Sequence, residues 1–116
     1  MAKHKYLVLL RKQPGTGPQQ PPSPEAMQQM FAAYDEWKEK FKDAILDIGD
    51  ALKSGGRVVT ARGVADGPFA EVKEVVGGYM VVTADDWNGA IEVVRACPAS
   101  KTPGGSMEIR ELAGRV

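Results

Sequence analysis

Apolar residues first gather near the start of the chain. Residues 3–11 predict a β-strand, because the apolar run Tyr6–Leu10 stands between polar residues on both sides. Successive side chains of a strand point to opposite faces, so this run makes both faces apolar. A strand of that kind has to be covered on both faces.

A longer stripe with helical spacing follows and predicts one helix over residues 24–52. Ser23 supplies an N-cap hydroxyl and Pro24 occupies the first helical position. Residues Ser54-Gly55-Gly56 predict its end. Core packing is the expected role of the stripe, and a ligand pocket is the alternative. Its members are Met27, Met30, Phe31, Tyr34, Trp37, Phe41, Ile45, Ile48 and Leu52.

The rest of the chain predicts two strands, a second helix and a last strand. Gly77-Gly78 predicts a β-bulge, because glycine inside a strand is otherwise unfavourable. Thr83 is the expected N-cap of the second helix, with an acid three residues later, and Pro98 is expected to end it. The strands are predicted at residues 57–65, 75–83 and 106–112.

The element order strand, helix, strand, strand, helix, strand predicts an α+β fold of the ferredoxin-like βαββαβ type. Both helices would then cover the same face of an antiparallel sheet. The first and third strands are apolar on both faces, as Tyr6–Leu10 and Tyr79–Val82 show. An exposed apolar face of that size is rare on a monomer, so we expect a homodimer. Residues 12–22, rich in Pro and Gln, predict a loop that is either functional or a tolerated insertion.

Composition narrows the classes of function. The 116 residues predict a single domain over 1–116, and the 15 basic residues equal the 15 acidic ones. That balance, without clustered Lys or Arg, argues against nucleic-acid binding. No apolar run is long enough for a membrane span or a signal-peptide core, and one cysteine, Cys97, forms no Cys-x-x-Cys motif. We therefore expect a soluble cytoplasmic protein that uses no metal and no cofactor.

A four-residue segment, Asp66–Phe69, reads as a turn between two strands and is the most distinctive segment of the chain. Taken with several other segments, it resembles the DGPF-signature branch of the YCII-related family, within the dimeric α+β barrel group. Two positions depart from that pattern: Val72 stands where Thr is common, and Glu111 where Pro is usual. The other matching segments are Tyr6–Leu10, Ala70-Glu71, Lys73-Glu74, Gly77-Gly78-Tyr79, Cys97-Pro98 and Gly105–Arg110.

The resemblance implies a homodimeric barrel with a cleft between sheet and helices. Relatives include enzymes that act on small aromatic or lactone compounds, with a His–Asp pair proposed for proton transfer. Members are also often encoded beside extracytoplasmic-function sigma factors. We therefore expect binding of a small, mostly apolar ligand, with cofactor-free acid–base chemistry as an added role. The alternative is a non-catalytic regulatory or accessory module for such a sigma factor. Whether the chain is an enzyme stays open.

Candidate site residues follow from the chemistry of the side chains. Asp66 is the one acid–base candidate, and a purely structural role in the turn is the alternative. His4, the only histidine, is expected to be a surface or sheet-edge residue, and Cys97 to be inert packing. The predicted ligand-binding residues are Arg62, Phe69, Tyr79, Tyr6 and Lys73.

Overall fold

Four strands form the main antiparallel sheet, in the order β2-β5-β1-β6, and two others form a separate hairpin, β3–β4. The computed structural model describes residues 3–13, 23–53, 55–67 and 75–114. The elements are β1 (His4–Lys12), α1 (Pro24–Lys40), β2 (Ile45–Ala51), β3 (Gly56–Thr60), β4 (Gly63–Gly67), β5 (Val75–Ala84), α2 (Trp87–Ala96), the 3₁₀ helix η1 (Pro98–Lys101) and β6 (Gly105–Glu111).

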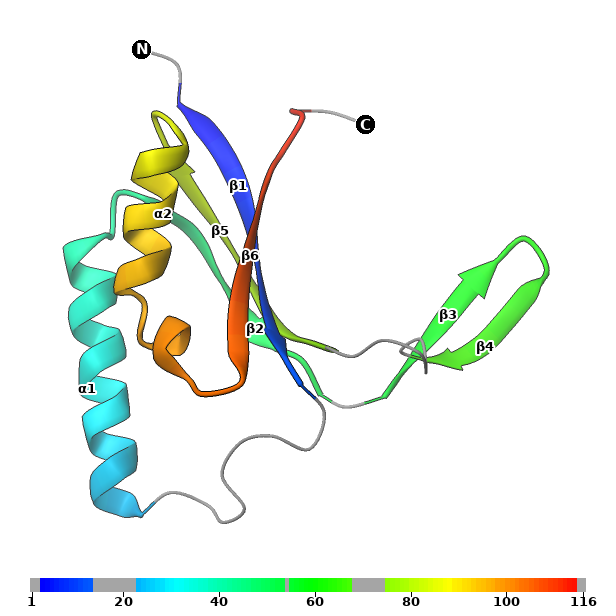
Figure 1. The fold of residues 1–116 in the computed structure, drawn as a ribbon, viewed down its shortest axis with the longest axis horizontal. Helices are drawn as coiled ribbons and strands as arrows, with labels where there is room; N and C mark the ends of the chain where they lie inside the picture. Colours follow the sequence, from blue (N-terminus) through cyan, green and yellow to red (C-terminus); the bar gives the residue numbers. More distant parts are fainter. Residues whose placement is uncertain (1–2, 14–22, 54, 68–74, 115–116) are drawn as a thin grey trace.

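The main sheet has the ferredoxin-like topology predicted from the sequence. Without the hairpin, the chain runs β1-α1-β2-β5-α2-β6, and all neighbouring strands are antiparallel. Figure 1 shows both helices on one side of this sheet and the β3–β4 hairpin extending on the other side. The predicted fold class is therefore confirmed.

The face toward the helices holds the hydrophobic core. Tyr6 and Val8 from β1 and Val82 from β5 are the largest fully buried side chains. They pack with the buried side of α2, where Ala90, Val93 and Val94 recur at helical spacing, as expected for an amphipathic helix. The core thus forms mainly between α2 and the centre of the sheet.

The predicted bulge in β5 is confirmed. The pairing of β1 with β5 runs from His4 opposite Ala84 to Leu10 opposite Gly78, and then shifts so that Arg11 lies opposite Val76. Gly77 is the extra residue. Glycine has no side chain that must pack on either face of the sheet, so it suits a position where the pairing between strands is interrupted.

The predicted helix over residues 24–52 is wrong at its C-terminal end. Ser23 does cap α1 by accepting a hydrogen bond from the Ala26 N–H at 3.2 Å, but the helix ends at Lys40. The Phe41 carbonyl then accepts from both the Ala44 and Ile45 N–H groups, and the chain enters β2. If the helix had continued, β5 would lack its outer partner strand. The hydrogen-bonded pairing of β2 with β5 therefore outweighs the helical spacing of Ile45 and Ile48.

The predicted strand over residues 57–65 is also wrong. This segment is a hairpin, in which Val59 pairs with Val64 and Thr60 with Gly63. Gly63 has a φ of +142°, in the region that favours glycine, and this allows the tight reversal after Ala61 and Arg62. The second strand of the ferredoxin-like order is therefore β2, while β3 and β4 are additions to it.

The predicted N-cap of the second helix is wrong by three residues. Thr83 still belongs to β5, where its hydroxyl donates a hydrogen bond to the His4 carbonyl at 2.9 Å. Asp86 caps α2 instead, with its carboxylate accepting from the Gly89 N–H at 2.9 Å. The predicted stop at Pro98 is confirmed, since α2 ends at Ala96 and Pro98 opens η1.

Candidate functional site

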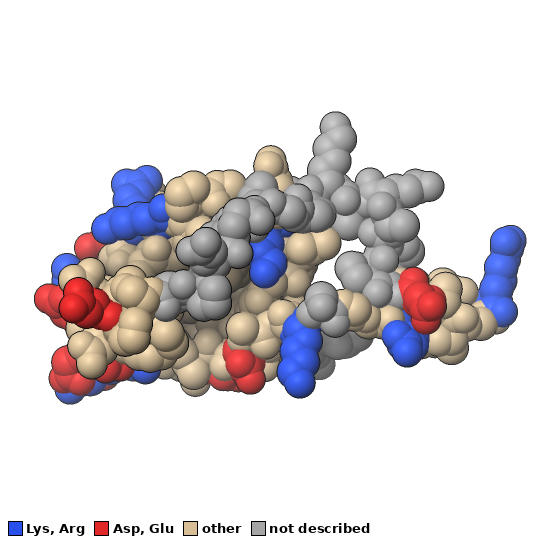
Figure 2. Space-filling model, turned by 90° about the horizontal axis from the view of Figure 1, so that it is seen from below, with Lys and Arg blue, Asp and Glu red and all other residues tan. Residues whose placement is uncertain are grey.

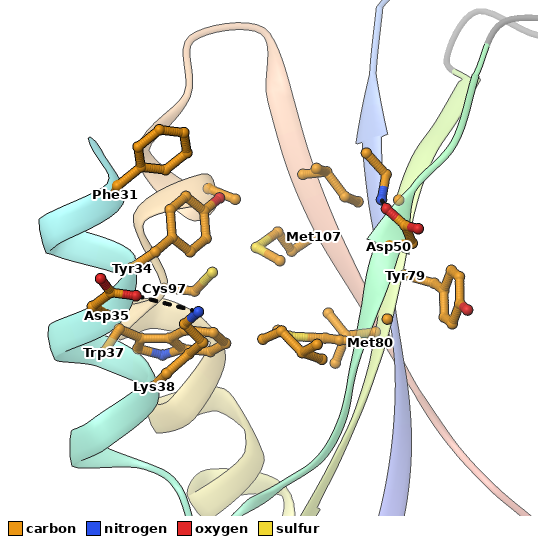
Figure 3. Close-up of a pocket in the computed structure, with 17 residues that line it drawn as sticks. Phe31, Tyr34, Asp35, Trp37, Lys38, Asp50, Tyr79, Met80, Cys97 and Met107 are labelled. Atoms are coloured by element: carbon orange, nitrogen blue, oxygen red, sulfur yellow. Dashed lines mark hydrogen bonds and ion pairs between the residues drawn. The ribbon is translucent and has the colours of Figure 1, made fainter. Parts of the chain in front are cut away.

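A cleft of about 350 Å³ lies between α1 and the main sheet. Figure 3 shows Phe31, Tyr34 and Trp37 projecting from α1 on one side, with Met80 from β5 facing them from the sheet. Met107 from β6 and Cys97, which follows α2, also line it. The walls therefore combine aromatic rings and sulfur-containing side chains that come from α1, β5, β6 and the residue after α2.

Trp37 fixes one end of the cleft. Its indole N–H donates to the Val93 carbonyl of α2 at 2.9 Å, and the side chain is only 4 % exposed. Toward its N-terminus α1 stands off the sheet: Met30 and Phe31 are 44 % and 55 % exposed. The expectation that the whole apolar stripe is core is wrong for this half of the helix, because none of the described strands covers it.

Glycine shapes the wall formed by β2 and β5. Gly49 has a φ of +68°, and a Cβ atom placed there would collide with the Tyr79 carbonyl. The backbones of β2 and β5 therefore approach closely at the register irregularity after Asp47. A larger residue at position 49 would push β2 outward and change the shape of the cleft.

The polar groups in the cleft are few. Lys38 Nζ lies 3.3 Å from Asp35 Oδ1, so these opposite charges neutralise one another at the rim. Burial raises the pKa of the Tyr34 hydroxyl, and the neighbouring Cys97 adds to the effect. Burial likewise raises the pKa of the Cys97 thiol, against hydrogen bonds from Ala99 and Ser100 that lower it. Both groups remain protonated at neutral pH, so the cleft offers neutral hydrogen-bond donors within apolar walls.

The thiol at Cys97 has the environment predicted for a packing residue. It is 2 % exposed and stands directly after α2, where the helix dipole disfavours a thiolate. His4, also as expected, is on the sheet surface. Its Nδ1 lies 3.4 Å from Glu111 Oε2, and half of its side chain is exposed.

The predicted site residues lie in different parts of the molecule. Asp66 and Arg62 belong to the hairpin, and Asp66 pairs across it with Arg57, with Nε and Oδ1 3.6 Å apart. The Asp66 side chain is 93 % exposed and is not among the groups that line the cleft. Asp66 and Gly67, the first two residues of the predicted turn, are thus the last residues of strand β4, and the turn prediction is wrong for them. Pro68 and Phe69 lie outside the described residues.

Tyr6 and Tyr79 lie on opposite faces of the main sheet. Tyr6 is 1 % exposed and packs its ring against Trp87, with ring centroids 5.0 Å apart. Tyr79 borders the cleft through its backbone, but Figure 3 shows its ring on the far side of the sheet. Phe69 and Lys73, the other two predicted ligand-binding residues, lie outside the described residues.

Phe31, Tyr34 and Met107 line the cleft but are not among the predicted ligand-binding residues, although a ligand pocket was the alternative role of the stripe that holds Phe31 and Tyr34. The helical stripe did contain the first two, and their partial exposure, which only the structure shows, separates them from core positions. Met107 alternates with charged neighbours in β6, so the pattern places it on a buried face without indicating which cavity it reaches.

The sheet face opposite the helices is called here the open face, defined by Leu7, Leu9, Tyr79 and Val81. Leu7 pairs with Val81 and Leu9 with Tyr79, so these side chains share one face. None of the described helices lies on this side of the sheet. Tyr79 is 39 % exposed.

Charged residues border the open face at both edges. Asp47 and Asp50 of β2 lie opposite Val81 and Tyr79. At the other edge, Glu108 accepts a hydrogen bond from Arg11 at 2.6 Å and lies 3.5 Å from Arg110. The hydrogen bond from Arg11 is the main reason why the pKa of Glu108 is lowered. One edge is therefore acidic, whereas arginine predominates at the other.

The residues that the structure describes hold neither a metal-binding cluster nor a membrane-spanning helix. In ranges 3–13, 23–53, 55–67 and 75–114, His, Cys, Asp and Glu side chains do not gather in threes as a metal ion requires. The helices within the same ranges are too short or too polar to cross a bilayer. Figure 2 shows acidic and basic side chains interspersed on the face it presents, without a basic stripe.

Comparison with known proteins identifies the family. No curated protein matches the chain. The family model for the YCII-related domain matches residues 5–113, from the start of β1 to just beyond β6. The match covers every strand and helix described above. The chain therefore belongs to the YCII-related family.

Proposed function

We propose that this chain is a homodimeric protein that binds a small, mostly apolar, aromatic or lactone-like ligand in the cleft between α1 and the main sheet. The observation that carries the proposal is the lining: three aromatic side chains and two methionines around about 350 Å³. Pockets of this kind, apolar with a few placed polar groups, are the usual form of small-molecule sites. A volume at the lower end of their range fits a ligand of one or two rings.

The chemistry of the lining narrows the class of ligand. Phe31 and Tyr34 offer ring faces and edges, and methionine sulfur makes favourable contacts with aromatic rings. The Tyr34 hydroxyl is held protonated, so it can donate a hydrogen bond to a carbonyl or lactone oxygen. The charged residues that line the cleft are the paired Asp35 and Lys38 and the acidic Asp50, so a ligand with two negative charges would find no unpaired cation among the described lining residues. These features favour a neutral or singly charged aromatic compound.

Membership of the DGPF branch is part of this proposal. It is supported by the sequence Asp66–Phe69 and by the Gly105–Arg110 segment, which forms the final strand β6. The acid–base role of Asp66 remains a prediction. Its exposed position in the hairpin supports binding as the primary activity, with any proton transfer at Asp66 secondary to it.

The homodimer is supported by the open face. A two-fold axis parallel to the strands would place the acidic β2 edge of one copy over the arginine-rich β6 edge of the other. The apolar centre, Leu7, Leu9 and Val81, would then be buried between two sheets. An obligate interface of this kind buries on the order of 2,000 Å² or more.

Ligand binding is tested by a thermal-shift screen with aromatic acids, phenols and lactones, followed by calorimetric titration of each compound that raises the melting temperature. Phe31→Ala should weaken binding of a true cleft ligand about tenfold, which corresponds to roughly 1.4 kcal/mol of lost contact. Met30→Ala is the matched control, since Met30 neighbours Phe31 and is similarly exposed but does not line the cleft. Its affinity should stay within about twofold.

Two results would contradict the proposal that the cleft binds a ligand. One is a screen in which none of the three compound classes raises the melting temperature. The other is equal loss of affinity in Phe31→Ala and Met30→Ala. Either would favour the alternative, a non-catalytic accessory module such as one that acts with a sigma factor.

A further inference from the structure

We propose that the β3–β4 hairpin is an arm that packs against a second copy of this chain, with the face that carries Val59 and Val64 buried at the contact. This inference rests on the proposed homodimer and adds an element to its interface. It is carried by the isolation of the hairpin, by the exposure of one apolar face, and by the direction in which the hairpin extends.

The hairpin has little support from its own chain. Within residues 3–13, 23–53, 55–67 and 75–114, β3 and β4 form a two-stranded sheet of their own and pair only with each other. Figures 1 and 2 show the hairpin projecting beyond the body formed by the main sheet and helices. Isolated two-stranded hairpins are marginally stable in water and need a further surface to pack on.

The two faces of the hairpin are not equivalent. Val59 and Val64 lie directly opposite each other and are 73 % and 67 % exposed. On the other face Val58 is half-buried and pairs with Ala65. A cross-strand pair of β-branched residues stabilises a sheet mainly when it is covered, so Val59 and Val64 form the face that lacks cover.

The direction of the hairpin identifies its partner. It extends on the same side of the main sheet as the open face, opposite the helices (Figure 1). Stacked sheets lie about 10 Å apart, whereas the five-residue strands of the hairpin extend roughly 17 Å. A second sheet that covers the open face therefore lies within reach of the hairpin, and by symmetry each copy extends an arm toward the other.

Charge does not favour a different class of partner. On the Val59–Val64 face the neighbouring charged residues are Arg57 and Asp66, which pair with each other at 3.6 Å. The face is thus apolar with a neutral ion pair beside it. Such a surface suits another apolar protein surface. Arg62, in the turn between β3 and β4, adds one cation to the hairpin, which does not make the basic stripe that a polyanion would contact.

The arm is tested by sedimentation equilibrium on the full chain carrying single substitutions in β4. Val64→Asp places a charge on the exposed apolar face, and Ala65→Asp places the same charge one residue away on the other face. We expect Val64→Asp to raise the dimer dissociation constant at least tenfold, and Ala65→Asp to change it less than threefold. Circular dichroism on both variants checks that the main sheet is intact.

Trypsin cleavage of the wild-type chain gives a second measurement that needs no variant. The arm contains Arg57 and Arg62, so cleavage there should be at least tenfold slower above the dimer dissociation constant than below it. Suppose that the wild type is a dimer, that Val64→Asp and Ala65→Asp have the same dimer dissociation constant, and that trypsin cleaves equally fast above and below that constant. This result would contradict the role of the hairpin as an arm, but it would not contradict the dimer. A wild-type monomer at all concentrations would overturn both.

Discussion

The two faces of the main sheet come from the same strands but differ in how they are covered. On the helix side Tyr6 and Val8 of β1 are 1 % and 0 % exposed, whereas Tyr79 on the open face is 39 % exposed. The residues of β1 are apolar on both sides, so composition does not distinguish the faces. What differs is the presence of helices. The open face therefore has the apolar composition of a buried surface, although none of the described helices covers it.

This comparison explains why a small sheet needs more than its own helices. With α1 displaced at its N-terminal end to form the cleft, α2 and the Trp37 end of α1 supply most of the helix-side packing. A domain of this size buries a smaller fraction of its surface than a larger one. Burying the open face against a second copy would then contribute much of the remaining stability.

The largest effect is expected on the helix side, at Trp37. Trp37→Ala should lower the free energy of unfolding by about 3–5 kcal/mol, because it removes a buried ring and leaves the Val93 carbonyl without its indole donor. Denaturant unfolding at a fixed protein concentration measures the loss. Phe41→Ala should cost less, since Phe41 ends α1 and is only partly buried.

Lys38→Ala is the control for this prediction. Lys38 lies one residue away on the same helix, and its exposed ion pair with Asp35 contributes little. Its unfolding free energy should stay within about 0.5 kcal/mol of the wild type. A Lys38→Ala loss as large as that of Trp37→Ala would mean that the helix-side core lies elsewhere.

A smaller but sharper effect is expected on the open face. Leu9→Asp should raise the dimer dissociation constant about a hundredfold, equivalent to roughly 2.7 kcal/mol, because an unpaired carboxylate would be buried between the two sheets. Light scattering and sedimentation equilibrium measure the change. Leu9 pairs with Tyr79 at the centre of this face, away from the helix-side core.

Met27→Asp provides the matched control on the helix side. Met27 is 37 % exposed on α1 and does not line the cleft, so its variant should remain dimeric. If Leu9→Asp and wild type have the same dissociation constant, the open face is not the interface. The apolar second side of β1 would then require another explanation.

Sequence reasoning predicted the fold class correctly but assigned its second strand to the wrong residues. The spacing of Ile45, Ile48 and Leu52 continues the helical stripe of α1, and a register irregularity in β2 hides the alternation of a strand. Gly49 was the missed signal. A glycine is unfavourable inside a helix, and here it has a positive φ that only the close approach of β2 to β5 explains.

A second glycine, Gly63, explains why the hairpin was predicted as a single strand. The segment from Arg57 to Ala65 looks like one strand if Gly63 is passed over, and the resulting element order matches the ferredoxin-like pattern by coincidence. Gly63 permits the reversal that makes two short strands. Local propensity thus identified β1, β5 and β6, where pairing and pattern agree, and failed where glycine changes the backbone direction.

A cleft between sheet and helices was implied by the family resemblance, but the residues that line it could not be assigned from the sequence, for a different reason. Phe31 and Tyr34 have the spacing of core residues, and only the tilt of α1 away from the sheet makes them cleft residues. Tilt depends on packing between distant segments, such as Trp37 against Val93, which no local pattern reports. The predicted site residues that the structure describes, in contrast, lie on the hairpin and on the two sheet faces.

The smallest effect is expected from replacing Asp66. This replacement tests whether the hairpin is part of a ligand-binding site. The Asp66 carboxylate is almost fully exposed, and among the described residues it pairs only with Arg57, across the hairpin. Asp66→Ala should therefore change the unfolding free energy by less than about 1 kcal/mol. The affinity of a cleft ligand should stay within twofold, as should that of Asp66→Asn. A tenfold loss of affinity in both variants, with stability unchanged, would contradict this expectation. Because Asp66 does not line the cleft of its own chain, the hairpin would then have to reach the cleft of a second copy, and the carboxylate itself would be the contacting group.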